Sequence, residues 1–495
     1  MKIINTISGK KEELVPREGK KVNMFVCGPT VYDYIHIGNA RTFVFFDVVA
    51  KYLRHRGYDV NYIQNITDID NKIIERAQKE GVDPLKYAKK YGEIFKQDMQ
   101  ALGVTSPEYK NATEHIPEVI KQVQTLLDKG NAYVIENDPF DKLRTGGIYF
   151  DISTFPDYGK LSGRTAGMAD DAVSRIDDSD KKRNRGDFAI WKFSQEGDPT
   201  EVLGGLKHRQ ETIPSWLAPF GDGRPGWHIE DTAITEKYFG PRYDLHGGGQ
   251  DLIFPHHEAE IAQQESASGK KPFVKYWMHV AFLINKEGKM SKSLGNFETA
   301  NELLKKYRKE HLRYYLLSGH YRQPLEYSKE SIQNLESTLS RLSNYYHQLK
   351  KVGNETPDNF SKTIKNKVEE FYSAMDDNFN TPSALASIFE LISETYQPAF
   401  EGKVNKSSAQ DITNFLDKMN EIFGIILPFV MESDAAEIDK LREEGKLTEA
   451  TKKREVIVKE GYIVQTSILG TTVIPGIEIK QTPPLIIKKK ENPEQ

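Results

Sequence analysis

The segment between residues 22 and 63 constrains the fold more than any other part of the sequence. An apolar run at residues 22–26 ends in Cys27-Gly28-Pro29, and residues 40–56 follow with apolar side chains at helical spacing. A second apolar run comes at residues 60–63. Strand, helix and strand over about forty residues predict a βαβ unit, and therefore a parallel sheet. Ligands of such sheets bind beyond the carboxyl ends of the strands, where we expect Cys27 to lie.

The chain changes character beyond Arg322. Apolar residues recur there at alternating spacings of three and four, which predicts helices with one buried face. The first stripe comprises Ile332, Leu335, Leu339, Leu342, Tyr346 and Leu349. Residues 137–147 and 195–221 read as loops or insertions because they are rich in Gly, Pro and charge. The 495-residue length agrees with about three domains.

Composition excludes several classes of protein. The longest apolar stretch, residues 422–431, is far short of the roughly 20 residues that cross a bilayer, so we expect no membrane span. The first residues lack the apolar core of a signal peptide, and the chain has one cysteine, which together predict a cytoplasmic protein. The net charge of -4 is not that of a non-specific nucleic-acid binder, although local patches could still bind a structured nucleic acid.

Two short motifs have the chemistry of phosphate binding. His36-Ile37-Gly38-Asn39 stands just before the first predicted helix, where orphan backbone N–H groups and the helix dipole attract anions. Lys289-Met290-Ser291-Lys292-Ser293 places two lysines on a loop, where they can neutralise charge on a leaving pyrophosphate. Either motif alone also fits an ordinary turn or a solvated loop.

Together the two motifs resemble the signatures of class I aminoacyl-tRNA synthetases, and the wider strings resemble cysteinyl-tRNA synthetase. The strings are FVCGPTVYDYIHIGNARTFVFFDVV, NYIQNITDIDNKII, GRPGWHIED, DLHGGGQDLIFPHHEAEIAQ and KMSKSLGNF, and the resemblance runs from about residue 20 to about 395. It implies a Rossmann-like α/β catalytic domain over residues 1–320 with an inserted connective region at about 110–225. A helical tRNA-binding bundle of the anticodon-binding type over 321–430 and a small C-terminal region over 431–495 would follow.

The resemblance also implies a zinc ion, one per subunit, that takes the thiolate of substrate cysteine. Cys27, His256 and Glu260 match the family's ligands, and the last two are four residues apart, so on a helix they share one face. The family usually has a second cysteine after Trp-His-Ile-Glu, where this chain has Asp231. We expect Asp231 to replace it as a ligand through oxygen, with weaker affinity or altered metal selectivity. The alternative for Asp231 is a helix cap or a hydrogen-bonding carboxylate, and His257 is interpreted as a packing histidine.

The remaining site residues carry over by motif match. Thr67 and Trp227, with Cys27, would line the cysteine pocket, although Thr67 also fits a helix cap and Trp227 a core residue. ATP, with Mg²⁺ bound to it, would contact the residues of three motifs: His36, Gly38, Asn39, Gly248, Gly249, Asp251, Lys289 and Lys292. Of these, His36, Asn39, Lys289 and Lys292 would be catalytic, because they would stabilise the phosphates.

The implied activity is formation of cysteinyl-adenylate and pyrophosphate from L-cysteine and ATP, followed by transfer of cysteine to the 3′ end of tRNA(Cys). A monomer is the family expectation. Two alternatives stay open: a tRNA-independent ligase that passes cysteine to a small amine, and a non-catalytic paralogue that binds tRNA or cysteine. The long helical extension argues against the first, and the intact phosphate motifs argue against the second. The sequence identifies neither the anticodon-reading residues nor a role for the two insertions.

Overall fold

The computed structural model describes residues 1–136, 146–164, 181–194, 213–285, 288–289 and 298–479. The chain divides into two compact units, each built from several segments. The first comprises Met1–Asn301, Leu316–Ser328 and Glu369–Ala386, and the second comprises Glu302–Tyr315, Lys329–Val368 and Ser387–Gln495. No helix within the described residues has the length and apolar character needed to cross a membrane.

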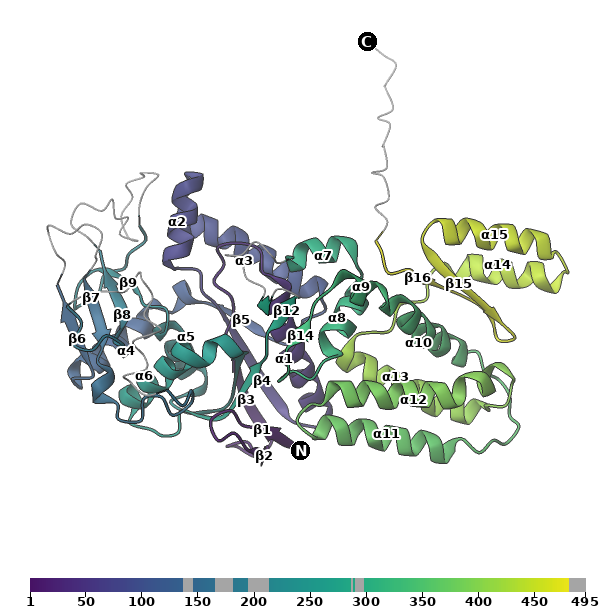
Figure 1. Ribbon diagram of the computed structural model, residues 1–495, viewed down its shortest axis with the longest axis horizontal. Coiled ribbons are helices and arrows are strands. Elements are labelled where there is room, and N and C mark those ends of the chain that lie inside the picture. Colours follow the sequence, from purple (N-terminus) through teal and green to yellow (C-terminus); the bar gives the residue numbers. More distant parts are fainter. Residues whose placement is uncertain (137–145, 165–180, 195–212, 286–287, 290–297, 480–495) are drawn as a thin grey trace, which may run out of the picture. The chain divides into compact units, whose positions relative to one another are not determined.

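A five-stranded parallel sheet forms the centre of the first unit (Figure 1). The predicted βαβ unit is confirmed, because β3 and β4 pair in parallel and α1 (Ile37–His55) connects them. The order along the sheet is that of a doubly wound nucleotide-binding fold, in which the connections reverse direction between β3 and β10. In that order the strands are β11 (Val274–Val280), β10 (Tyr243–Gly249), β3 (Lys21–Val26), β4 (Asp59–Ile66) and β5 (Glu108–Asn111).

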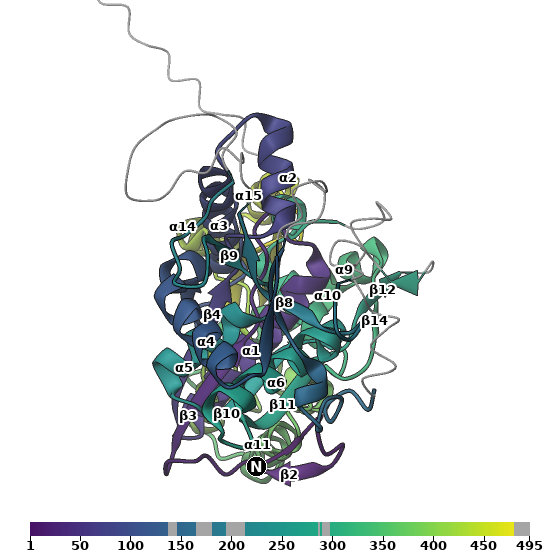
Figure 2. The same cartoon turned by 90° about the vertical axis from the view of Figure 1, so that its left-hand side faces the viewer.

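Helices cover both faces of this sheet. On one face α1 packs Phe46 so closely against β10 that a Cβ at Gly247 would lie 2.2 Å from the Phe46 ring. On the other face, apolar residues of α4 (Ile116–Asp128), α5 (Ile229–Phe239) and α6 (Glu258–Ser268) share one buried core with Phe25 and Ile63. Figure 2 shows α5 and α6 beside β3, β10 and β11. Two further helices, α2 (Asn71–Glu80) and α3 (Pro84–Ala101), follow β4.

An antiparallel sheet occupies the predicted inserted region. It has four strands in chain order, and the first two, on either side of the predicted loop at 137–147, pair with each other. Most of both predicted loops, at 137–147 and 195–221, lies outside the described residues. The strands are β6 (Ala132–Ile135), β7 (Gly147–Phe150), β8 (Phe188–Phe193) and β9 (Gly223–Pro225).

The predicted helical region beyond Arg322 is also confirmed. The first stripe folds as α9 (Lys329–Gln333) and α10 (Leu335–Leu349), with Leu339, Leu342 and Leu349 buried. The stripe is thus interrupted at Asn334, between the two helices. A β-hairpin packs against α10, α14 and α15 near the end of the described chain. The other elements are α11 (Ser361–Asp376), α12 (Thr381–Phe400), α13 (Lys406–Phe423), α14 (Glu432–Glu443), α15 (Leu447–Lys459), β15 (Tyr462–Ser467) and β16 (Gly470–Pro475).

Candidate active site and metal centre

A cavity of about 740 Å³ opens where β3 and β10 end, at the point where the sheet connections reverse. The backbone N–H of Cys27 donates to the carbonyl of Gly247, 3.0 Å away, and so continues the pairing of the two strands to the cavity wall. Most of the site residues predicted from the sequence line this cavity. They are Cys27, His36, Gly38, Asn39, Thr67, Trp227, Asp231, Gly249, Asp251 and His256.

The phosphate motif begins α1. His36 is the N-cap residue, and its Nδ1 accepts a hydrogen bond from the backbone N–H of Asn39 at 3.2 Å. A neutral imidazole that accepts at Nδ1 carries its proton on Nε2, so His36 has a donor for an anion. Gly38 permits this turn, because a Cβ there would lie 2.9 Å from Nδ1 of His36. The cavity wall therefore includes a helix N-terminus with a histidine N–H group beside it.

The other predicted ATP residues are Gly248, Lys289 and Lys292. Gly248 is not among the residues that line the cavity, and a Cβ there would be 2.8 Å from the ring of His257. Lys289 belongs to the short strand β13 (Gly288–Lys289), and Lys292 lies outside the described residues. The predicted roles of the two lysines therefore stay predictions.

Four predicted metal ligands converge beside Cys27. The Sγ of Cys27 is 3.3 Å from Oδ2 of Asp231 and 3.7 Å from Oε1 of Glu260. Nε2 of His256 is 3.1 Å from Oδ2 of Asp231 and 3.0 Å from Oε1 of Glu260. All four residues are buried, and their donor atoms lie within 4.8 Å of one another. A thiol, an imidazole and two carboxylates at such distances form a group that could hold a metal ion.

A hydrogen bond from Asn65 orients Asp231. Asp231 lies in the first turn of α5, and its Oδ1 accepts a hydrogen bond of 2.6 Å from Nδ2 of Asn65. The Oδ1 of the same amide accepts a 2.5 Å hydrogen bond from the backbone N–H of Gly28. One carboxylate oxygen of Asp231 is thereby occupied, and the other faces Cys27 and His256.

The buried donor group carries an unfavourable concentration of acidic side chains. Burial raises the pKa of the Cys27 thiol well above its usual value, and the charges of Glu260 and Asp231 add to the rise. Burial and the charge of Asp231 likewise raise the pKa of Glu260 well above its usual value. Oε2 of Glu260 is buried without a hydrogen-bond partner. A bound cation would reverse these effects, because its charge favours the thiolate and the carboxylates.

The structure contradicts the alternative roles of Thr67 as a helix cap and of Trp227 as a core residue. Thr67 does not cap a helix: α2 begins at Asn71 and its N-cap is Asp70, whose carboxylate accepts from the backbone of Lys72. The hydroxyl of Thr67 instead donates to Glu230 at 3.0 Å. Trp227 is not a core residue, because 41% of its surface is exposed. Its ring stacks on His256 with centroids 4.4 Å apart.

Sequence reasoning missed two groups of residues at the site. His246 and His257 each direct Nε2 at Sγ of Cys27, at 3.2 and 3.1 Å. The motif containing His246 predicts contacts with ATP through Gly248, Gly249 and Asp251, and gives His246 itself no role. The second group lies on α2, where Lys72, Arg76 and Lys79 line the cavity. Their spacing of four and three places them on one helix face, and that spacing was a signal available in the sequence.

The comparisons with known proteins agree with this geometry. Residues 13–337 match the family model of the tRNA synthetases class I (C) catalytic domain, and residues 370–427 match that of the DALR domain. Two solved structures share the fold. The ternary complex of Agrobacterium radiobacter LeuRS with tRNA and LeuAMS has a TM-score of 0.61 at 13% identity, covering 82% of this chain and 84% of the other. Mycobacterium tuberculosis methionyl-tRNA synthetase bound by methionyl-adenylate has a TM-score of 0.60 at 16% identity, covering 82% and 92%. Fold and site thus define a class I tRNA synthetase.

Curated relatives identify the family within this class. The cysteine–tRNA ligase of Carboxydothermus hydrogenoformans is 40% identical over 489 residues, which cover 95% of this chain and 99% of the relative. Those of Thermococcus gammatolerans and Coxiella burnetii are 39% and 41% identical, each covering 95% of this chain and 98% and 99% of the relative. The chain belongs to the cysteine–tRNA ligase family.

Proposed function

We propose that this protein activates L-cysteine with ATP, forming cysteinyl-adenylate and pyrophosphate, and then transfers cysteine to the 3′ end of tRNA(Cys). One observation carries the proposal: a single cavity is lined by the N-terminal turn of α1 and by residues of a buried thiol–imidazole–carboxylate group. The first suits the phosphates of a nucleotide, and the second suits recognition of a thiol through a metal. The family membership of the chain supports the same reaction.

Zinc is the metal that the donor set fits best. Cys27 supplies a soft sulfur, His256 a borderline nitrogen, and Asp231 and Glu260 oxygens, and zinc accepts all three atom types. A thiol has only one proton to share among the groups around Sγ of Cys27, whereas a cation would bind Oδ2 of Asp231 and Oε1 of Glu260 together. A bound zinc ion would favour cysteine over serine, because it binds a thiolate and a serine hydroxyl offers no comparable ligand. Shape alone would discriminate cysteine from serine by only about 1–3 kcal/mol.

The side chains of the cavity position the reactants. Nε2 of His36, the side chain of Asn39 and the backbone at the start of α1 would hold the phosphates of ATP, to which Mg²⁺ is bound. Gly249 and Asp251 would contact the adenosine, with the carboxylate accepting from ribose hydroxyls. The substrate carboxylate then attacks the α-phosphate, and Lys289 and Lys292 would neutralise the leaving pyrophosphate. No protein nucleophile is required.

The substrate side chain would lie between Trp227, which is partly exposed, and Thr67, which is buried. Trp227 forms an exposed wall that stacks on His256, and Thr67 is buried and held by Glu230. Together with Cys27 they would line the pocket for the side chain of substrate cysteine. The tRNA would bind to the helical region over residues 321–430, and we propose a cytoplasmic monomer.

Cysteine-dependent ATP–pyrophosphate exchange tests this function, with serine as the rival substrate and the metal content measured on the same sample. We expect exchange with cysteine only and at least one zinc ion per chain. Cysteine-dependent exchange without any charging of tRNA(Cys) would favour the ligase that acts on a small amine. Absence of exchange in a folded, zinc-loaded protein would refute catalysis and favour the binding paralogue.

A further inference from the structure

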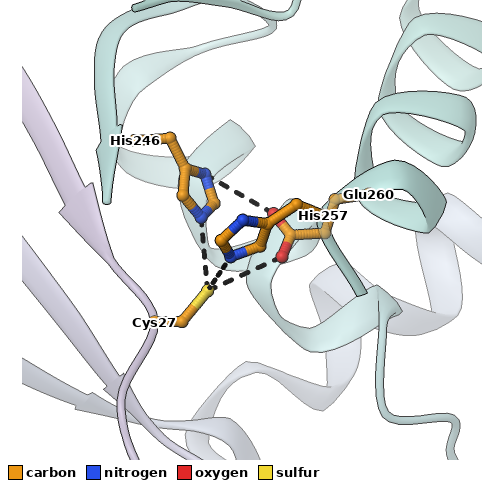
Figure 3. Close-up of side chains that lie close together, drawn as sticks. All are labelled: Cys27, His246, His257 and Glu260. Carbon is orange, nitrogen blue, oxygen red and sulfur yellow. Dashed lines mark hydrogen bonds and ion pairs between the residues drawn. The ribbon is translucent and has the colours of Figure 1, made fainter. Parts of the chain in front are cut away.

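We propose that Cys27, His246, His257 and Glu260 form a second metal-binding position, beside the one formed with Asp231 and His256. Figure 3 shows the four side chains converging from β3, β10 and the start of α6. Nε2 of both histidines faces Sγ of Cys27, at 3.2 and 3.1 Å, and Oε1 of Glu260 is 3.7 Å from the same sulfur. One donor atom from each of the four residues lies within 4.8 Å of the others, and every residue is buried.

The hydrogen bonds of the two imidazoles point to metal binding. A ligating histidine donates its other N–H to a fixed partner, which holds the ring and directs the lone pair at the metal. Nδ1 of His246 is 2.6 Å from the hydroxyl of Tyr243. Nδ1 of His257 is 2.8 Å from Nε2 of His279, whose own Nδ1 is 2.8 Å from Oγ1 of Thr6. With protons on these Nδ1 atoms, each bond is satisfied and both Nε2 lone pairs face Cys27.

Glu260 is shared by the two positions, because its Oε1 is near both His256 and Sγ of Cys27. Its Oε1 lies 3.0 Å from Nε2 of His256, on the side of Asp231. Its Oε2 lies 3.5 Å from Nδ1 of His246, the nitrogen beside the hydroxyl of Tyr243, and makes no hydrogen bond. A buried carboxylate with an unpartnered oxygen is costly, and a cation bound to Glu260 would offset its charge.

The two positions differ in access and in donor type. Cys27, Asp231 and His256 line the cavity, so the first position faces the substrate. His246 and His257 have no exposed surface and do not line the cavity, so the second position is closed on the side of the two histidines. The second set has one sulfur, two nitrogens and one oxygen. It is softer than the first set, where an aspartate stands in place of the usual cysteine, and it suits Zn²⁺ or Co²⁺.

Metal binding by a His256→Gln variant tests the second position, because this change removes a donor from the first set alone. We expect the purified variant, dialysed against Zn²⁺ or Co²⁺, to retain about one ion per chain, and the Co²⁺ form to keep a thiolate-to-cobalt charge-transfer band. The double variant His256→Gln/His257→Gln should lose both the ion and the band. The matched control is His256→Gln/His311→Gln, because His311 is equally buried and lies in the other compact unit.

The readout is metal content, so the test does not depend on ligase activity. A folded His256→Gln variant that binds no metal would overturn the second position. Equal metal content in the single variant and the His257 double variant would overturn it too, because the ion would then rely on Asp231. If the double variant does not fold, X-ray absorption at the zinc edge of His256→Gln decides. One sulfur and two imidazoles are expected there, and a shell without imidazole contradicts the proposal.

Discussion

Replacing Asn65 by alanine should weaken the metal centre without touching a metal ligand. The amide of Asn65 donates to Oδ1 of Asp231 at 2.6 Å and accepts from the backbone of Gly28 at 2.5 Å. The bond to a buried carboxylate is worth about 1.5–3 kcal/mol. Loss of a group that orients a ligand usually costs about 10–100-fold in metal affinity, or about 1.4–2.8 kcal/mol at 1.4 kcal/mol per tenfold. The two ranges agree, so we expect zinc affinity to fall by about 10–100-fold.

Competition with a chromophoric chelator measures the zinc dissociation constant of each variant. The matched control is Asn61→Ala, on the same strand β4, where the amide donates to Asn23 at 3.3 Å instead of to Asp231. This control should keep the affinity of the parent protein. Urea unfolding of the metal-free proteins separates lost stability from lost affinity. Parent-like zinc affinity in Asn65→Ala would refute the reasoning, because Asp231 would then bind no zinc or need no orientation.

Three further outcomes can be measured. Gly38→Ala would place a Cβ 2.9 Å from Nδ1 of His36 and displace the ring. We expect kcat/KM of pyrophosphate exchange to fall by about 100-fold. A fall of less than twofold would contradict the role of His36. Trp227→Ala should raise KM for cysteine. The unfolding temperature should stay near that of the parent protein, because Trp227 is 41% exposed. An unchanged KM would exclude Trp227 from the cysteine pocket. Arg313→Met should destabilise the second unit by about 1–3 kcal/mol in urea unfolding, because buried Arg313 donates to two carbonyls at the end of α13. Unchanged stability would show that these hydrogen bonds do not stabilise the unit.

The part of the fold that sequence reasoning predicted is the part that local pattern determines. The strand, helix and strand of the βαβ unit each have a periodicity of their own, and Gly57 ends the helix cleanly. The strand that pairs with β3 on the side away from β4 could not be predicted in this way. That neighbour is β10, about 200 residues later, and strand pairing at such a distance depends on the packing of the whole unit.

The candidate site could likewise be predicted from the sequence only in part. The i,i+4 spacing of His256 and Glu260 predicts a shared face, and the structure brings the two side chains to 3.0 Å. The neighbouring His257 could not be interpreted from spacing. The turn Ile253–His257, which precedes α6, contains the non-helical residue Phe254, and it brings Nε2 of His257 to 3.1 Å from Sγ of Cys27. Thr67 and Asp70 are both good capping residues, so composition alone could not decide which one starts α2.

The inserted antiparallel sheet has a consequence for how the family can vary. It lies between Cys27 and Asp231, which are 204 positions apart in sequence and 3.3 Å apart in space. Any ion held between them closes a loop that contains the whole inserted sheet. The entropy of closing a flexible loop grows only with the logarithm of its length, by about 0.6 kcal/mol for each doubling. Lengthening or shortening this insertion should therefore cost the metal centre little free energy.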